Sequence, residues 1–522
     1  MNVVFRVDAS TQMGIGHLMR CLALAEALRQ CGVHVSFVCR EHPGSLNALL
    51  GYKAIPVILL PIPSARQVGM AFSDDYAAWL GVTQLEDAEQ TIEALNGERP
   101  DWLIVDHYGL DINWEKRLRP HVNKLMVIDD LANRLHDCDL LLDQNYSDVS
   151  EFRYAGLIND GCKLLLGPRF ALLKPEYAAF RKTHCAHEGP VKCVFVFFGG
   201  SDLQDMTGMA LDALSRADLR HLEVFVVVGI NNLHRKSIER RVSQRSLTTL
   251  YENRPHLADL MVRADLAIGA GGTTTWERMC LGLPTIVVTI AENQRPASAA
   301  LAKAKLVKYA GHSDTVTCDQ LAQLLLGIIH NPVELRELGD KNQLQVDGLG
   351  VPRLIELIRS SDAETLSVRR AERSDLATYY NWANDPLVRK NAITTAPVAW
   401  AVHQAWFAKK LNDDNSLLFV LEAGELPVGQ IRFDIVGDEA IIDYSLDEIV
   451  RSRGWGCRLI ELGVDQIWRT RQLPLRADVK VENEASVSVF LKMGFTESPV
   501  PSSGRRTFYL NPSDCFAQVD RL

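Results

Sequence analysis

A histidine-containing glycine loop near the N-terminus is the segment best suited to chemistry. Gly14-Ile15-Gly16-His17 follows a β-branched run, residues 3–7, and precedes an amphipathic helical pattern that begins at about Leu18. The glycines allow a tight turn and close approach of the backbone, and a helix start offers unpaired N–H groups to phosphate. A dinucleotide fingerprint would continue to a third glycine, whereas this loop continues to His17. The loop predicts chemistry on a nucleotide-linked substrate rather than redox chemistry.

A second loop of small residues follows a β-like run at 266–268. Its candidate phosphate ligands are Gly271, Gly272, Thr273 and Thr274. Glu277, one turn into the next helix, has the bidentate acceptor that two ribose hydroxyls need, and Asn293 is suited to a phosphate or a base. The plainer alternative is that these glycines only form turns and that Glu277 is solvated.

An arginine- and glycine-rich segment near the C-terminus has the composition of a pyrophosphate-binding loop. Its candidate residues are Arg451, Arg453, Gly454, Trp455, Gly456, Cys457 and Arg458. Guanidinium groups, glycines and the start of a helix together suit a diphosphate.

The elements that position these loops alternate between strand and helix. The first set of predicted strands is 3–7, 33–38, 102–105, 125–128 and 140–142, and the second is 193–198, 224–228, 266–268 and 285–288. Alternation of this kind predicts parallel sheets wrapped by helices, with ligands at the carboxyl ends of the strands. A polar linker is predicted at 360–365. The part of the chain beyond it has predicted antiparallel strands and helices, which indicate an α+β domain. The strands are 417–421, 428–433, 439–446 and 475–479, and the helices begin at about 456 and cover 485–492. The fold class is therefore α/β, with domains at 1–150, 151–360 and 361–522.

Composition narrows the class of protein. The chain has 522 residues and a formal charge of −9, which argues against a dedicated nucleic-acid binder. Charges appear by Arg6, too early for a secretory signal, and no apolar stretch is long enough to span a membrane. The eleven cysteines show no zinc-like spacing, which favours reduced thiols in a cytoplasm.

Several motifs of the first 355 residues together resemble the GT-B nucleotide-sugar enzymes, and more closely the UDP-sugar hydrolases of pseudaminic acid biosynthesis. The motifs are residues 5–10, Gly14–Cys21, Asp106-His107-Tyr108, Ile128-Asp129-Asp130-Leu131, Asp143-Gln144-Asn145-Tyr146 and Asn293-Gln294. The resemblance implies that UDP-2,4-diacetamido-2,4,6-trideoxy-β-L-altropyranose loses UDP at the anomeric carbon, with inversion and without a metal.

The same resemblance implies roles for individual residues. His17 would position or deprotonate water, with Asp8 orienting it or contacting the sugar. The implied UDP-sugar ligands are Gly14, Gly16, Arg20, Gly271, Gly272, Thr273, Thr274, Glu277 and Asn293. Alternatively, His17 only caps its loop and Asp106, Asp129 and Asp130 only form turns, while His107 and Tyr108 remain candidates for a cleft.

Residues 365–512 resemble the GNAT superfamily of acyl-CoA-dependent N-acyltransferases. The resemblance rests on R-x-x-G-x-G at Arg451, on N-x-x-S-x-x-x-F-x-x-x-G-F at Asn483, and on Trp382–Arg389, which is similar to the small-molecule and ribosomal-protein branches. It implies acetyl-CoA as the donor, bound by the loop amides of Trp455 to Arg458 and by Asn483. Phe490 departs from the tyrosine that the superfamily often uses to protonate the thiolate. Asp443 and Glu439 are candidate bases.

In the resembled pathway, N-acetylation of a UDP-linked 4-amino sugar directly precedes hydrolysis. The sequence therefore predicts a bifunctional enzyme whose partners are small-molecule UDP-sugars, with no nucleic acid and no membrane. The alternatives are a GT-B glycosyltransferase with an appended acyltransferase, and a nucleotide-sugar sensor. The sequence leaves the sugar stereochemistry and the oligomeric state open.

Overall fold

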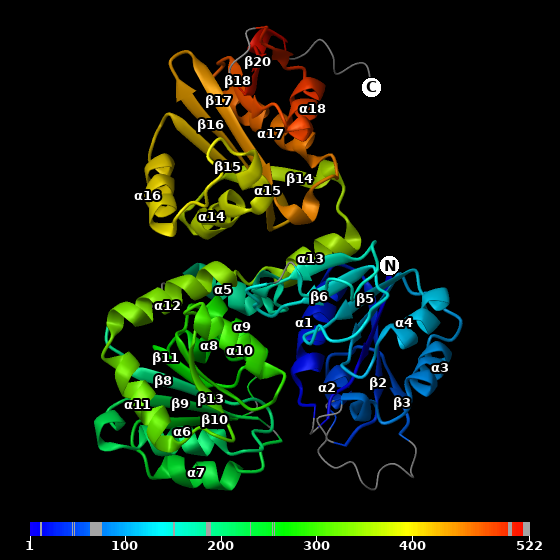
Figure 1. Cartoon of the computed structure of the whole chain (residues 1–522), viewed down its shortest axis with the longest axis vertical. Helices are drawn as coiled ribbons and strands as arrows, with labels where there is room; N and C mark the ends of the chain where they lie inside the picture. The colour runs from blue at the N-terminus through cyan, green and yellow to red at the C-terminus, as the bar shows by residue number, and fades with distance from the viewer. Residues whose placement is uncertain are drawn as a thin grey trace. The chain divides into compact units, whose positions relative to one another are not determined.

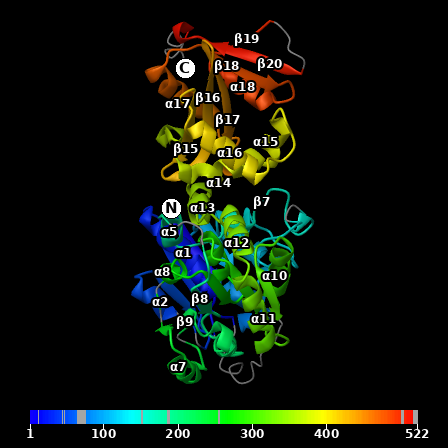
Figure 2. The same cartoon turned by 90° about the vertical axis from the view of Figure 1, so that its left-hand side faces the viewer.

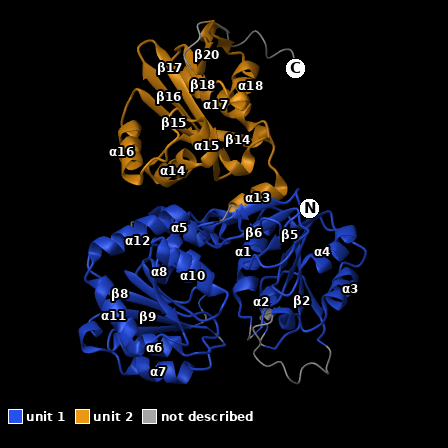
Figure 3. Cartoon of the chain, in the orientation of Figure 1, with its two compact units in different colours: residues 1–351 blue, residues 352–522 orange. Residues whose placement is uncertain are grey.

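The structure is a computed structural model that divides into two compact units, residues 1–351 and 352–522 (Figure 3). It describes residues 1–10, 13–43, 45, 47–62, 76–149, 152–183, 189–229, 231–252, 254, 256–499 and 504–514. No helix within these ranges has both the length and the apolar character needed to cross a membrane.

The first unit begins with a seven-stranded parallel sheet, coloured blue to cyan in Figure 1. Its strand order is β3-β2-β1-β4-β5-β6-β7. Its strands are β1 (Asn2–Val7), β2 (His34–Arg40), β3 (Val57–Leu60), β4 (Trp102–Asp106), β5 (Lys124–Ile128), β6 (Leu140–Asp143) and β7 (Lys163–Leu166). The helices are α1 (Gly16–Gln30), α2 (Asn47–Tyr52), α3 (Gln84–Ala94) and α4 (Ile112–Leu118). All five predicted strands are confirmed, whereas β3 and β7 were not predicted. Because β7 pairs with β6, the first lobe extends past the boundary predicted at residue 150.

A second parallel sheet of six strands follows in the order β10-β9-β8-β11-β12-β13. Its strands are β8 (Cys193–Phe197), β9 (Glu223–Val228), β10 (Thr248–Glu252), β11 (Leu266–Gly269), β12 (Thr285–Thr289) and β13 (Lys308–His312). The helices are α5 (Pro175–Thr183), α6 (Met206–Leu214), α7 (Arg235–Ser243), α8 (Ala258–Met261), α9 (Thr274–Cys280), α10 (Gln294–Lys303), α11 (Cys318–Ile329) and α12 (Pro332–Gln345). We call residues 1–166 the first lobe and 167–351 the second lobe.

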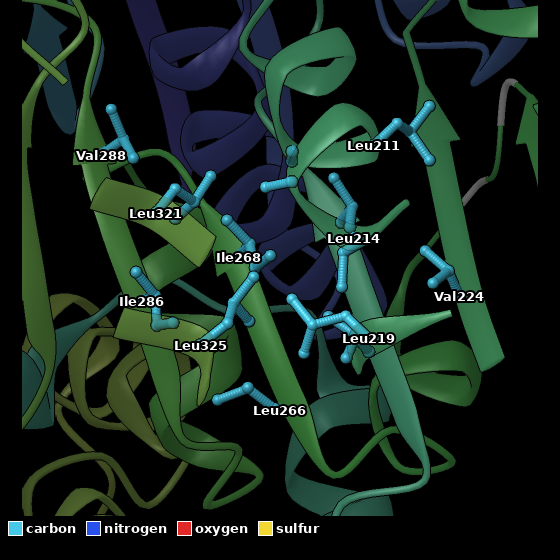
Figure 4. Packing of buried hydrophobic residues seen from close by; sticks show 14 of the residues in the cluster. Leu211, Leu214, Leu219, Val224, Leu266, Ile268, Ile286, Val288, Leu321 and Leu325 are labelled. Carbon is cyan, nitrogen blue, oxygen red and sulfur yellow. The ribbon is translucent and has the colours of Figure 1, made fainter. Parts of the chain in front are cut away.

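Leucine, isoleucine and valine side chains fill the interior of the second lobe. Figure 4 shows Leu211 and Leu214 of α6 and Leu321 and Leu325 of α11 packed over strand residues such as Ile268. Buried strands covered by helices are the arrangement that continuous apolar runs predict for a parallel sheet. The two predicted parallel sheets wrapped by helices are thus confirmed.

Both lobes have a switch point where the strand order reverses direction. In the first lobe it lies between β1 and β4, and in the second between β8 and β11. Ligands of open α/β sheets bind at such points, outside the carboxyl ends of the strands. The His17 loop follows β1 and the Gly271 loop follows β11, so each loop singled out in the sequence lies at a switch point.

The second unit is built on a mixed sheet in the order β14-β15-β16-β17-β18-β20-β19. Its strands are β14 (Leu366–Arg370), β15 (Ser416–Ala423), β16 (Leu426–Val436), β17 (Glu439–Leu446), β18 (Leu475–Lys480), β19 (Thr496–Glu497) and β20 (Arg505–Leu510). The helices are α13 (Gly350–Arg359), α14 (Leu376–Asn384), α15 (Pro386–Asn391), α16 (Trp400–Leu411), α17 (Trp455–Thr470) and α18 (Glu484–Lys492). Figure 2 shows this unit from a second side. The predicted α+β domain is confirmed.

The parallel strands β17 and β18 pair over a short distance only. Their register has two pairs, Ala440 with Leu475 and Ile441 with Arg476. Both strands continue beyond these pairs, and their carboxyl-terminal parts separate. Each strand keeps its neighbour on the outer side, β16 or β20, but its backbone groups on the inner side face no strand.

The start of the second unit differs from the predicted boundary at residue 360. The division falls at Val351, so nearly all of α13 belongs to the second unit. Glu356 of α13 pairs with Arg453 at 2.6 Å and accepts hydrogen bonds from the amide and hydroxyl of Ser361 at 3.0 and 2.6 Å. The first residues of the predicted linker are therefore anchored to this helix.

Candidate active sites

His17 is held by an aspartate at the end of the neighbouring strand. Its Nδ1 lies 2.6 Å from Oδ1 of Asp106, which ends β4. No residue that the structure describes engages Nε2, and the side chain is 12% exposed. Burial opposes ionisation of Asp106, but Arg20 and His17 outweigh it and hold the Asp106 pKa well below its ordinary value. An ionised Asp106 favours the tautomer with hydrogen on Nδ1, which leaves the Nε2 lone pair to accept a proton.

Arg20 positions the cluster around His17 instead of lying open to a ligand. It is 4% exposed, and it bonds both oxygens of Asp106 at 2.7 Å and Asp130 at 2.7 Å. Asp130 accepts a hydrogen bond from the Tyr108 hydroxyl at 2.6 Å, and the Tyr108 ring meets the His17 ring edge-on at 4.6 Å. Contact of Arg20 with the UDP-sugar therefore stays a prediction, and in this structure its guanidinium is occupied by carboxylates.

Asp106 and not Asp8 holds Nδ1 of His17, so the expectation that Asp8 orients His17 is wrong, whereas contact of Asp8 with the sugar stays a prediction. Asp8 is buried, its two oxygens pair with Arg6 at 2.6 and 2.9 Å, and Oδ1 also accepts the Arg40 amide at 2.6 Å. His42 and His107 face its other oxygen at 3.5 and 3.4 Å. Arg6 and Asp8 are two residues apart, so they point to the same side of the strand, into the interior. His107 belongs to this buried cluster and not to a cleft.

Residues of the two lobes meet beside His17. A Cβ atom at Gly16 would lie 3.6 Å from Oγ1 of Thr273, and a Cβ atom at Gly200 would lie 3.3 Å from the Ile15 side chain. Asn293 donates a hydrogen bond to the Tyr108 hydroxyl at 3.2 Å. The His17 loop therefore faces the switch point of the second lobe, and Asn293 reaches the histidine cluster.

Glycine is required for different structural reasons in the His17 loop and in the Gly271 loop. Gly14 has φ of +74°, a conformation that favours glycine. A Cβ atom at Gly271 would lie 2.5 Å from Oγ of Ser298 on α10, so packing alone requires a glycine there. Gly272 has ordinary room, with the Gln294 side chain 3.7 Å away. The plainer alternative thus explains Gly271, whereas Gly272 is compatible with a ligand.

Threonines form the start of α9, as the phosphate-binding interpretation requires. Thr273 precedes the helix and Thr274 opens it, and no side chain among the described residues caps this end. Arg278 fixes the loop by donating to the Ala270 carbonyl at 2.7 Å. The amides of the first turn remain candidate phosphate ligands.

Glu277 is not the solvated helix residue of the alternative interpretation. Tyr177 of α5 donates a hydrogen bond to its carboxyl group, while Oε2 is buried and has no partner among the residues that the structure describes. Burial raises the pKa of Glu277 to about 7. An unsatisfied buried oxygen is costly, so this group is suited to a ligand hydroxyl.

The second unit has a cavity of about 530 Å³ where β17 and β18 separate. Of the predicted site residues, Asp443, Arg451 and Asn483 line it. Asp443 accepts a hydrogen bond from Gln430 at 2.9 Å, and Arg451 pairs with Asp385 at 2.8 Å. Asn483 caps α18, accepting the Ser486 amide at 3.3 Å. Glu439 pairs with Arg476 outside the cavity lining, so it is not a base in this cavity.

The predicted pyrophosphate loop is only partly available to a ligand. Gly454 precedes α17 with φ of +79°. Arg453 is turned to Glu356 and lies over the buried Trp455, while Arg458 pairs with Glu461 at 2.9 Å. Binding of acetyl-CoA by the Arg453 side chain stays a prediction, and it would require this side chain to leave Glu356. Binding by the amides of Trp455, Gly456, Cys457 and Arg458 stays a prediction.

Sequence reasoning missed residues whose roles depend on a distant partner. Tyr177 meets Glu277 from another helix, and Tyr444 lies in the cavity beside Phe490. The sequence alone is equally compatible with Asp106 as a turn former. Its position at the end of the strand next to β1 is the one signal that favoured His17 contact.

Each of the two units contains a match to a known protein family. Residues 193–350 match the profile of the glycosyltransferase family 28 C-terminal domain, and residues 365–496 match that of the acetyltransferase (GNAT) domain. Within the described residues, no group of three or more His, Cys, Asp or Glu side chains is placed to hold a metal ion.

Three curated relatives are similar to larger parts of the chain. The UDP-2,4-diacetamido-2,4,6-trideoxy-beta-L-altropyranose hydrolase of Campylobacter jejuni is 25% identical over 305 residues, covering 58% of this chain and 97% of the relative. The spore coat polysaccharide biosynthesis protein SpsG of Bacillus subtilis is 22% identical, covering 69% and 98%. An uncharacterised protein of Methanocaldococcus jannaschii is 23% identical, covering 83% and 84%. These matches support a bifunctional sugar-modifying enzyme with a GT-B-like part and an acetyltransferase-like part.

Proposed function

We propose that this chain carries out two consecutive steps on a UDP-linked amino sugar. The C-terminal unit transfers acetyl from acetyl-CoA to the 4-amino group of a UDP-4-amino-4,6-dideoxy-N-acetyl-β-L-altrosamine. The N-terminal unit then hydrolyses the product, UDP-2,4-diacetamido-2,4,6-trideoxy-β-L-altropyranose, to UDP and free sugar with inversion. The C. jejuni relative supports the second reaction, and the GNAT match supports the first.

The observation that carries the hydrolase proposal is the contact of His17 with Asp106. With Nδ1 directed to a carboxylate at 2.6 Å, Nε2 is the atom that takes a proton from water as it attacks the anomeric carbon. The C–O bond to the diphosphate breaks and its electron pair leaves with UDP. Because UDP is already a stabilised leaving group, aiming and activating water is the main task that remains.

The second lobe holds the UDP part in this proposal. The start of α9 meets the diphosphate through Gly272, Thr273 and Thr274, and Glu277 accepts the ribose hydroxyls. Asn293 lies between the lobes, where its amide reaches the sugar side of the diphosphate while it bonds Tyr108.

The acetyltransferase step uses the cavity between β17 and β18. Acetyl-CoA enters where the strands separate, with its pyrophosphate at the start of α17 and its pantetheine arm at Asn483. Asp443 is the candidate base that takes a proton from the amine, and it projects from the open part of β17 into this cavity. The amine nitrogen forms a bond to the acetyl carbon, and the C–S bond then breaks.

One incubation tests both steps. The purified chain is mixed with the UDP-4-amino sugar and acetyl-CoA, and free thiol and free UDP are followed together. We expect thiol release first, then UDP release that depends on acetyl-CoA. His17→Gln should keep thiol release and lower UDP release by about 10²-fold to 10⁴-fold, the usual contribution of general acid–base catalysis. Proton NMR of the fresh product sugar tests inversion.

The match to a glycosyltransferase C-terminal domain favours a second candidate, transfer of the sugar to an acceptor other than water. UDP release in buffer without any added acceptor separates the two, because a transferase requires the acceptor. UDP binding with no turnover in either assay would instead indicate a nucleotide-sugar sensor and contradict the proposal.

A further inference from the structure

Position 490, on α18, holds a side chain that cannot protonate a departing thiolate. Phe490 is 2% exposed and lines the cavity of the second unit. Its ring packs against Phe495 and Phe508, at centroid distances of 5.0 and 5.9 Å. If a side chain supplies this proton, it must come from elsewhere in the cavity wall.

Tyr444 of β17 places a hydroxyl next to this phenylalanine. The two rings meet edge-on with centroids 5.6 Å apart, and Tyr444 also lines the cavity. Cε2 of Tyr444 lies 3.8 Å from the Cβ position of Gly456, near the start of α17. The phenol therefore lies between the predicted pyrophosphate loop and α18, along the path proposed for the pantetheine arm.

The strand separates Tyr444 from the candidate base. Asp443 and Tyr444 are consecutive on β17, and successive side chains of a strand point to opposite faces. Asp443 bonds Gln430 and lies near Arg432 on one face, whereas Tyr444 contacts α17 and α18 on the other. An amine could be deprotonated on one side of the strand and a sulfur protonated on the other.

Ser486 connects Tyr444 to a source of protons. The Tyr444 hydroxyl donates to Oγ of Ser486 at 3.2 Å, and Nδ2 of Asn483 donates to the same oxygen at 3.0 Å. Ser486 is partly exposed, so its own hydroxyl hydrogen can exchange with solvent. Burial raises the pKa of Tyr444, which keeps the phenol protonated at neutral pH.

We infer that Tyr444 is the catalytic residue that protonates the coenzyme A thiolate, with Ser486 as the positioning residue that restores its proton. The inference rests on the proposed acetyltransferase function. When the tetrahedral intermediate collapses, the C–S electron pair moves to sulfur, the phenol proton passes to sulfur, and the phenolate takes a proton from the Ser486 hydroxyl. Ser486 recovers its proton from solvent.

Three variants of the full chain test this role. Tyr444→Phe removes only the hydroxyl, and Tyr509→Phe is the matched control because Tyr509 of β20 lies outside the cavity lining. The double variant Tyr444→Phe/Phe490→Tyr returns a hydroxyl from the adjacent ring. We expect Tyr444→Phe to lower the kcat of thiol release by about 10²-fold with little change in the KM for acetyl-CoA. Tyr509→Phe should match wild type, and the double variant should recover part of the lost rate. Melting temperatures confirm folding.

A measurement of coenzyme A binding tests the role of Tyr444 even if the amine substrate is not the proposed one. Wild type should bind coenzyme A more tightly than desulfo-coenzyme A by about threefold to tenfold, the range for one hydrogen bond. Tyr444→Phe should abolish this preference and leave desulfo-coenzyme A binding unchanged. A Tyr444→Phe variant with wild-type kcat, or with the wild-type preference for coenzyme A, overturns the role of Tyr444 alone. Failure of wild type to bind coenzyme A overturns the proposed acetyltransferase function as well.

Discussion

At the scale of single residues, two buried carboxylates of the first lobe differ in what they contact. Asp8 and Asp106 both lie at strand ends, both are buried, and both pair with an arginine. Only Asp106 reaches His17, because β4 lies next to β1 at the switch point. The chemistry of the site therefore depends on which strand each carboxylate ends.

Removing one carboxylate at a time separates catalysis from stability. Asp8→Asn and Asp106→Asn each break a buried ion pair, so both should lose stability, by about 3–5 kcal/mol in the usual range for such changes. Only Asp106→Asn should also lower the kcat of UDP release, by about 10²-fold or more, because His17 loses the partner that fixes its tautomer. Steady-state rates at a temperature where both variants are folded check this. An equal kcat for the two variants would contradict the role of Asp106.

The raised pKa of Glu277 predicts a pH dependence of UDP binding. Only the carboxylate accepts two ribose hydroxyls, and with a pKa of about 7 this form dominates above neutral pH. We expect UDP affinity to rise between pH 6 and pH 8, and Glu277→Gln to bind more weakly with a flat profile. Isothermal titration calorimetry across this pH range measures the affinity. A wild-type affinity for UDP that does not change with pH would contradict the predicted role of Glu277.

Ionisation of Glu277 also makes the stability of the folded chain depend on pH, in a direction that can be predicted. The folded state binds the Glu277 proton more tightly than the unfolded chain, so its contribution to stability is present at low pH and is lost as pH rises toward about 7. Glu277→Gln should therefore raise the melting temperature relative to wild type more at pH 8 than at pH 4.

At the scale of elements, the Gly271 loop shows how packing and binding can be distinguished. A side chain at Gly271 would collide with Ser298 of α10, whereas Gly272 has room. Gly271→Ala should lower stability by about 1–3 kcal/mol, the usual cost of overpacking, and Gly272→Ala is the matched control. Adding Ser298→Gly to Gly271→Ala should restore much of the loss in a thermal melt. A stable Gly271→Ala variant that fails to bind UDP would show that the glycine serves the ligand.

The elements were predictable where local patterns decide them, and less so where distant contacts do. The buried apolar runs of β1, β4 and β8 are recognisable in the sequence, as are the glycines that follow β1 and β8. Strands β10 and β13 contain partly exposed residues throughout and were missed, because their pattern lacks a buried run. The contact of His17 with Asp106 depends on strand order, and the ion pair of Arg453 with Glu356 depends on a residue of α13, so neither contact could be predicted from the local sequence.

At the scale of the whole molecule, one chain joins two proposed active sites whose reactions share an intermediate. A tether raises the effective concentration of an intermediate at the second site when its release and capture compete with diffusion. The proposal thus predicts a kinetic advantage of the joined chain.

That advantage can be measured with full-length variants. Wild type is compared with an equimolar mixture of two variants. His17→Gln keeps the acetyltransferase site and Tyr444→Phe keeps the hydrolase site. The two samples are compared at equal rates of thiol release. We expect a shorter lag before UDP release in wild type. Equal lags would reject transfer within one chain and leave both activities intact.

Helix α13 determines how the two catalytic parts can be separated or exchanged. Glu356 holds Arg453 beside the start of α17, although the two residues are far apart along the chain. A gene fragment that begins at residue 361 would discard this clamp and leave Arg453 without its carboxylate, whereas one that begins at Pro352 keeps it. Any gene fusion that joins this acetyltransferase-like unit to another enzyme would therefore have to include α13 within the fused segment.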